Sequence, residues 1–110
     1  MTVRTLSPPA TIVHLSGDID IFTTAQLRRR LLNALDSSTG ALQLDLAQVT
    51  FCSAGGLGVL LGVQARAKAQ GVALTLASVP PFMLRLLHVT GLARRFPIAP
   101  SPLISANSLN

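Results

Sequence analysis

Aromatic residues and cysteine are scarce in this 110-residue chain, which has four Phe, one Cys and no Trp or Tyr. A single cysteine excludes an intramolecular disulfide and is typical of proteins in a reducing cytosol. The few aromatic rings leave little to stack on bases or sugars, which disfavours nucleic-acid and carbohydrate ligands. The N-terminal residues lack the apolar stretch of a signal peptide, so the sequence predicts a cytoplasmic protein.

Acidic residues are also few: the chain has four Asp and Glu and nine Lys and Arg, which gives a net charge of +5. The cations are scattered along the chain, which indicates a general attraction to acidic partners and no dedicated nucleic-acid interface. Hydrophobic residues make up 49% of the chain and charged residues only 12%. A chain of this length and composition has enough apolar surface to fold as one domain around one core.

Charge is missing altogether between Asp45 and Arg66, so a membrane-spanning helix has to be weighed for this window. Such a helix needs roughly 20 predominantly apolar residues without interruption. Polar side chains interrupt this window, and Gly55 and Gly56 divide it into two short segments with different periodicities. The sequence therefore predicts no membrane insertion and favours a strand followed by a helix.

Strands and helices are predicted to alternate along the chain. Apolar, β-type runs predict strands at residues 3–5, 11–17, 41–46, 72–78 and 96–98. Leucines at helical spacing predict three helices, which start near Thr23 or Thr24, after Ser53 and at Pro80-Pro81. Alternation of this kind is typical of an α/β fold, with helices packed on a central sheet.

Cys52 and the two histidines are candidates for chemistry, but their surroundings argue against it. A reactive thiol needs a base that a third group orients, and neither His14 nor His88 has a carboxylate evidently placed for this role. One Cys and two separated His also match none of the usual metal-ligand spacings. These residues predict a buried, inert Cys52, no metal, no cofactor and no enzymatic activity.

The stretch FCSAGGLGVLLG, residues 51–62, places glycines at the predicted strand-to-helix turn. Such glycines can let a helix N-terminus approach a phosphate, which would make the chain a small nucleotide-binding protein. No Lys follows them, however, and their order is neither that of a P-loop nor that of a dinucleotide site. The alternative is steric: a sharp turn and close packing of the helix on the sheet. Open α/β sheets place their binding sites at turns of this kind.

Several ordered motifs give the chain a family resemblance. They are LSGDIDIFTTAQL at residues 15–27, DLAQVTF at 45–51, GLGVLL at 56–61, GVAL at 71–74 and LHVTGLARRFP at 87–97. In this order they resemble the STAS domains of bacterial anti-sigma factor antagonists over about residues 3–98. The resemblance implies the STAS fold, with a mixed, mostly parallel central sheet of about four or five strands. Residues 99–110 are expected to form a loosely ordered tail.

The resemblance implies a binding module that engages an anti-sigma factor of the serine kinase type and releases a sigma factor by partner switching. In this family the glycine turn commonly reads D-S-S-G-L-G, and phosphorylation of its second serine breaks the complex. Ser53, Ala54 and Gly55 occupy the first three of these positions. The acceptor hydroxyl is missing, which predicts an antagonist without the usual off-switch unless Ser53 is a displaced phosphorylation site. Ser53 is expected instead to cap the helix.

Two loops are predicted to form the partner-binding surface. Their candidate contact residues are Asp20, Thr23, Thr24, Ser53, Ala54, Gly55, Gly56 and Leu57. The resemblance aligns Asp20 with an aspartate beside the usual acceptor. A long charged side chain at Gly56 is expected to block the partner and leave the fold intact. Two further interpretations stay open, an accessory subunit of a membrane transporter and a homodimer.

Overall fold

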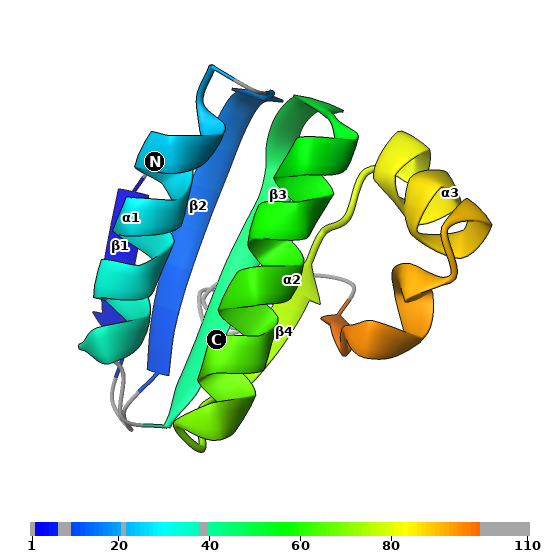
Figure 1. The fold of residues 1–110 in the computed structure, drawn as a ribbon. Helices are drawn as coiled ribbons and strands as arrows, with labels where there is room; N and C mark the ends of the chain where they lie inside the picture. The colour runs from blue at the N-terminus through cyan, green and yellow to red at the C-terminus, as the bar shows by residue number, and fades with distance from the viewer. Residues whose placement is uncertain (1, 7–9, 21, 38–39, 100–110) are drawn as a thin grey trace, which may run out of the picture.

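Within residues 2–6, 10–20, 22–37 and 40–99, which the computed structural model describes, five strands form one sheet in the order β1-β2-β3-β4-β5 (Figure 1). The strands are Thr2–Leu6 (β1), Ala10–Ile19 (β2), Ala41–Cys52 (β3), Ala73–Ala77 (β4) and Ile98–Ala99 (β5). β1 pairs antiparallel with β2, and the other neighbouring strands pair in parallel. The predicted mixed, mostly parallel α/β sheet is confirmed. The expected tail lies outside the described residues beyond Ala99.

The described residues also form three α-helices and one 3₁₀ helix. They are α1 (Thr24–Asp36), α2 (Ala54–Ala69), α3 (Pro81–Val89) and η1 (Leu92–Arg95). Gly71 and Gly91, with φ of +73° and +74°, follow α2 and α3 in the left-handed conformation, as predicted for helix stops. No helix in the described part of the chain is long and apolar enough to cross a bilayer.

The core lies between the sheet and helices α1 and α2, which lie side by side over one face of the sheet (Figure 1). Residues paired in register on the parallel strands point to this face. The fully buried leucines of the sheet and of these two helices are Leu31, Leu35, Leu42, Leu44, Leu46, Leu60 and Leu76. Burial of each such side chain stabilises the fold by about 1.5–3 kcal/mol. This packing fixes where the helices begin above the ends of the strands.

Two bulges bring the ends of β2 and β3 together. The register between the strands shifts once after His14 and once after Gly17, and β3 carries one extra residue at each shift. Both strands then end side by side, with Ile19 opposite Cys52. The connections into α1 and α2 therefore leave the sheet at the same edge, at the top of Figure 1.

Candidate functional site

The β2–α1 and β3–α2 connections are joined directly by a backbone hydrogen bond. The Ser53 N–H donates to the Ile19 carbonyl oxygen at 2.8 Å, which ties the start of α2 to the end of β2. Parallel sheets commonly place their binding sites at this edge. The structure therefore brings the two predicted loops to one end of the molecule (Figure 1).

Asp20 organises the first loop. Its Oδ1 accepts hydrogen bonds from the N–H groups of Phe22 and Thr23 at 2.9 and 3.2 Å. Its carbonyl oxygen accepts from the N–H groups of Thr23 and Thr24 at 3.1 and 3.0 Å. Thr23 is the N-cap residue of α1, but its side chain makes no cap hydrogen bond; it accepts instead from the Asp20 N–H at 3.0 Å. The carboxylate of Asp20 thus holds the turn that leads into α1.

Ser53 caps the second helix, as predicted. Its Oγ accepts from the Gly56 N–H at 3.1 Å, and its carbonyl oxygen accepts from the Leu57 N–H at 3.0 Å. Such a cap stabilises a helix by about 1 kcal/mol. The cap bonds the Gly56 N–H, and the Ser53 N–H donates to Ile19, which leaves fewer free N–H groups at this helix start for a phosphate to bind. Ala54 and Gly55 beside the cap are exposed.

Gly56 and Leu57 lie inside the molecule, which corrects their assignment as contact residues. Leu57 is 2% exposed. A Cβ at Gly56 would lie 2.6 Å from Ile19 Cγ2 and 3.0 Å from the Ile19 carbonyl oxygen, because the first turn of α2 packs on the end of β2. An arginine at position 56 would therefore disturb the fold, contrary to the sequence-based expectation. A Cβ at Gly55 meets nothing closer than Ser53 Oγ at 3.6 Å, so a blocking side chain fits there.

Three further residues at this edge were not identified from the sequence. Thr50 donates its hydroxyl to Asp18 Oδ1 at 2.7 Å, across the second bulge. Phe51 lies opposite Asp18 in the ladder and is 50% exposed, and Phe22 in the first loop is 87% exposed. The signal that could have found the two phenylalanines is their position next to the predicted loops, in a chain with only four Phe.

The hollow beside these loops is small. It lies between β2 and α1, holds about 160 Å³, and is lined by residues that include Asp18, Ile19 and Thr23. Small-molecule sites usually measure roughly 300–1,000 Å³. The site therefore has the form of a contact surface for a macromolecule more than that of a pocket for a nucleotide.

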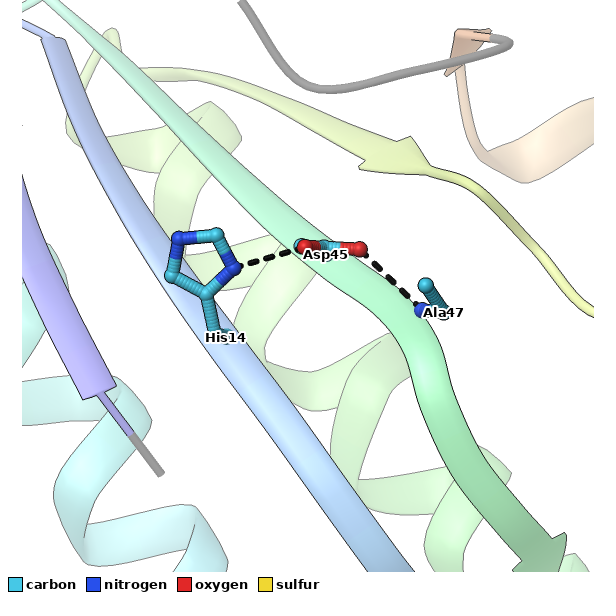
Figure 2. A network of polar contacts seen from close by, with 3 residues as sticks. All are labelled: His14, Asp45 and Ala47. Carbon is cyan, nitrogen blue, oxygen red and sulfur yellow. Dashed lines mark hydrogen bonds and ion pairs between the residues drawn. The ribbon is translucent and has the colours of Figure 1, made fainter. Parts of the chain in front are cut away.

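His14 does have a carboxylate partner, which corrects the expectation from the sequence. Its Nδ1 lies 2.6 Å from Asp45 Oδ2, and Asp45 Oδ1 accepts from the Ala47 N–H at 3.1 Å (Figure 2). The two side chains are paired in register on β2 and β3, just before the first bulge. Cys52 lies seven residues further along β3, about 20 Å away. The pair is therefore too far away to activate the thiol.

Cys52 is buried, as predicted, at 5% exposure. Loss of solvent around the thiol raises its pKa to about 11 from 9.0, so it is protonated at neutral pH. A protonated thiol is a weak nucleophile and a poor metal ligand. Among the described residues, no group of three or more His, Cys, Asp and Glu could hold a metal ion.

The raised pKa of Cys52 predicts a loss of stability in alkali. Between pH 9 and 11 the unfolded thiol loses its proton while the folded one keeps it, so the free energy of unfolding falls as the pH rises. A difference of this size corresponds to at most roughly 2–3 kcal/mol. Urea denaturation from pH 8 to 11 measures this loss. Cys52→Ala should show a shallower pH dependence, and equal slopes in the two proteins would contradict the prediction.

A family model matches most of this chain. The model described as "Mlab, STAS domain" matches residues 3–104. The anti-sigma-B factor antagonist of Bacillus subtilis (strain 168) is 31% identical over 80 residues, which cover 73% of this chain and 72% of that protein. The anti-sigma F factor antagonist of Paenibacillus polymyxa is 32% identical over 88 residues, or 79% and 75% of the two chains.

Solved structures include a similar fold. The crystal structure of an anti-sigma factor antagonist from Mycobacterium paratuberculosis superimposes with a TM-score of 0.77 and 28% sequence identity. The superposition covers 98% of this chain and 90% of that one. This chain is thus similar to anti-sigma factor antagonists in both sequence and fold.

Proposed function

Because the chain belongs to the STAS domain family of anti-sigma factor antagonists, we propose that it binds an anti-sigma factor of the serine kinase type. Binding to that partner releases a sigma factor by competition for one surface of the anti-sigma factor. This partner switching needs no bond to be made or broken by the chain itself. It requires only a preformed surface and sufficient affinity.

One observation carries the proposal: the two connections at the carboxyl edge of the sheet are joined into a single surface by the bond between Ser53 and Ile19. The exposed or half-buried candidates on it are Asp20, Thr23, Thr24, Ser53, Ala54 and Gly55. Gly56 and Leu57 support this surface from beneath and do not contact the partner. Because hydrogen bonds fix both loops before binding, little conformational entropy is lost when the partner docks.

We propose further that the complex lacks the usual phosphoserine switch. Gly55 has no side chain to phosphorylate, and Ala54 has no hydroxyl. Ser53 has one, but its Oγ is occupied in the helix cap by the Gly56 N–H. Phosphorylation there would remove the cap geometry. Ser53 is therefore a structural residue in this proposal, and the complex is regulated by the amounts of the partners.

The binding experiment uses purified ATP-binding anti-sigma factors encoded in the same genome as this chain. Calorimetry should give a Kd of micromolar or tighter for at least one of them, corresponding to about −8 kcal/mol. Adding the chain to a preformed sigma–anti-sigma complex should then release the sigma factor. Gly55→Arg is the matched variant, because it has room at the surface and should abolish binding without unfolding.

Two outcomes would overturn the proposal. The first is wild-type protein that folds but binds none of these anti-sigma factors. The second is a pull-down from the membrane fraction that recovers components of a permease, which would support the transporter-subunit alternative. Label at Ser53 after incubation with the kinase and ATP would overturn only the absence of a switch.

A further inference from the structure

Phe22 is the most exposed large hydrophobic residue of the described chain, at 87%. Single exposed hydrophobic residues are common and need no explanation by themselves. Phe22 differs from them in its position, because it lies within the first of the two joined loops. Val89, at 78% exposure on the last turn of α3, lies outside these loops and serves as a reference.

Several hydrogen bonds hold the backbone on either side of Phe22. The Phe22 N–H donates to Asp20 Oδ1 at 2.9 Å, and the next residue is bonded to the Asp20 carbonyl oxygen and carboxylate. The Thr23 hydroxyl also lies within 3.3 Å of the Asp18 carbonyl oxygen. A phenyl ring on such a backbone keeps only its own two torsions free. It can therefore be buried in a partner at low entropic cost.

A second aromatic residue and acidic charge accompany Phe22. Phe51, the penultimate residue of β3, is 50% exposed and lies opposite Asp18. The sequence has no Lys or Arg between Arg4 and Arg28, or between Arg30 and Arg66. The first loop therefore carries Asp18 and Asp20 without a cation of its own, and the second loop carries no charge, in a chain whose net charge is +5. Arg30 of α1 lines the hollow beside the first loop.

We propose that Phe22 is the anchor of the partner interface, and that it enters an apolar pocket on the anti-sigma factor whose rim carries Lys or Arg side chains. This inference rests on the proposed function and names the residue that determines its specificity. Phe51 extends the apolar contact, and the carboxylate of Asp18 faces the basic rim. Aromatic side chains that fill a pocket at the centre of an interface typically carry much of the binding energy.

Other occupants fit these observations less well. A nucleotide would need a larger hollow than the 160 Å³ beside the loop. A second copy of the chain would place the same acidic loops against each other if both contributed this face. A protein surface with an apolar pocket and a basic rim would bury the Phe22 ring and would attract the carboxylates of the first loop.

The test compares Phe22→Ala with Val89→Ala, with the anti-sigma factor that binds the wild-type chain as the probe. Calorimetry or biolayer interferometry should show that Phe22→Ala weakens binding roughly 30-fold or more, the size of a hot-spot residue. Val89→Ala should leave the Kd within about twofold, because rim and remote contacts contribute little. Both variants should keep the wild-type urea midpoint, since both side chains are exposed.

The proposed basic rim of the partner's pocket is tested by the salt dependence of binding. Raising the salt concentration should slow association of the wild-type chain with the same probe, and Asp18→Asn should reduce that salt dependence. The substitution keeps a side-chain oxygen to accept the Thr50 hydroxyl, so the bulge is retained. A wild-type complex that is insensitive to salt would overturn the basic rim.

The outcomes separate this inference from the proposed function. If no anti-sigma factor binds the wild-type chain, both fail. If one binds and Phe22→Ala keeps the wild-type affinity, only the anchor fails. If sedimentation shows a wild-type dimer that Phe22→Ala converts to a monomer, the occupant is a second copy and the proposed partner pocket is overturned.

Discussion

Gly56→Ala is expected to destabilise the protein by about 2–3 kcal/mol, the cost of forcing a methyl group into a packed core. The added Cβ would approach Ile19 Cγ2 to 2.6 Å, the Ile19 carbonyl oxygen to 3.0 Å and Cys52 Sγ to 3.1 Å. The side chain of Ile19 is itself buried, and its carbonyl oxygen is bonded to Ser53. Neither can move without opening the joint between the two loops.

Gly58→Ala is the matched control in the same helix. A Cβ there has no neighbour within 4 Å, and the residue is exposed. Alanine in an exposed helix interior is favoured over glycine by about 0.5–1 kcal/mol, so this variant should be as stable as wild type or slightly more so. Urea denaturation of the two variants measures the difference. Equal stability would show that the start of α2 does not pack on β2 as described.

Much of the fold followed from local patterns. The leucine spacing located the helices, Gly71 and Gly91 marked two of their ends, and β-type runs located the buried strands. These features depend on neighbours in the sequence, which is why periodicity reveals them. The last strand was placed two residues early, because a two-residue edge strand is defined by its pairing with β4.

The parts of the site that were missed depend on contacts between distant residues. His14 meets Asp45 only through the register of β2 and β3, which no local pattern encodes. The burial of Gly56 depends on how α2 is rotated against the end of β2. Since α2 carries Gly, Ala, Val and Leu on every side of its first turns, periodicity does not distinguish its buried face.

Under the proposed function, Gly55→Ser is expected to introduce a phosphorylation switch. Residue 55 is exposed in the first turn of α2, and a Cβ there makes only ordinary contacts with Ser53 Oγ and Thr24 Cγ2, at 3.6 and 4.0 Å. A phosphate at this position carries a charge of about −1.5 to −2 and is tolerated at a helix N-terminus. At the partner surface the same charge must be desolvated, so the affinity should fall at least about 100-fold.

The measurement combines phosphorylation mapping with binding to the same anti-sigma factor. Gly55→Ser should be labelled at position 55 by that kinase and ATP, while wild type and Gly55→Ala should not be labelled between residues 53 and 58. Gly55→Glu tests the charge effect without the kinase reaction and should also bind weakly. If phosphorylated Gly55→Ser binds as tightly as Gly55→Ala, the surface around residue 55 is not where the partner docks. Residue 55 has room for a side chain and Gly56 does not. Substitutions at residue 55 therefore test partner binding without disturbing the packing of α2 on β2.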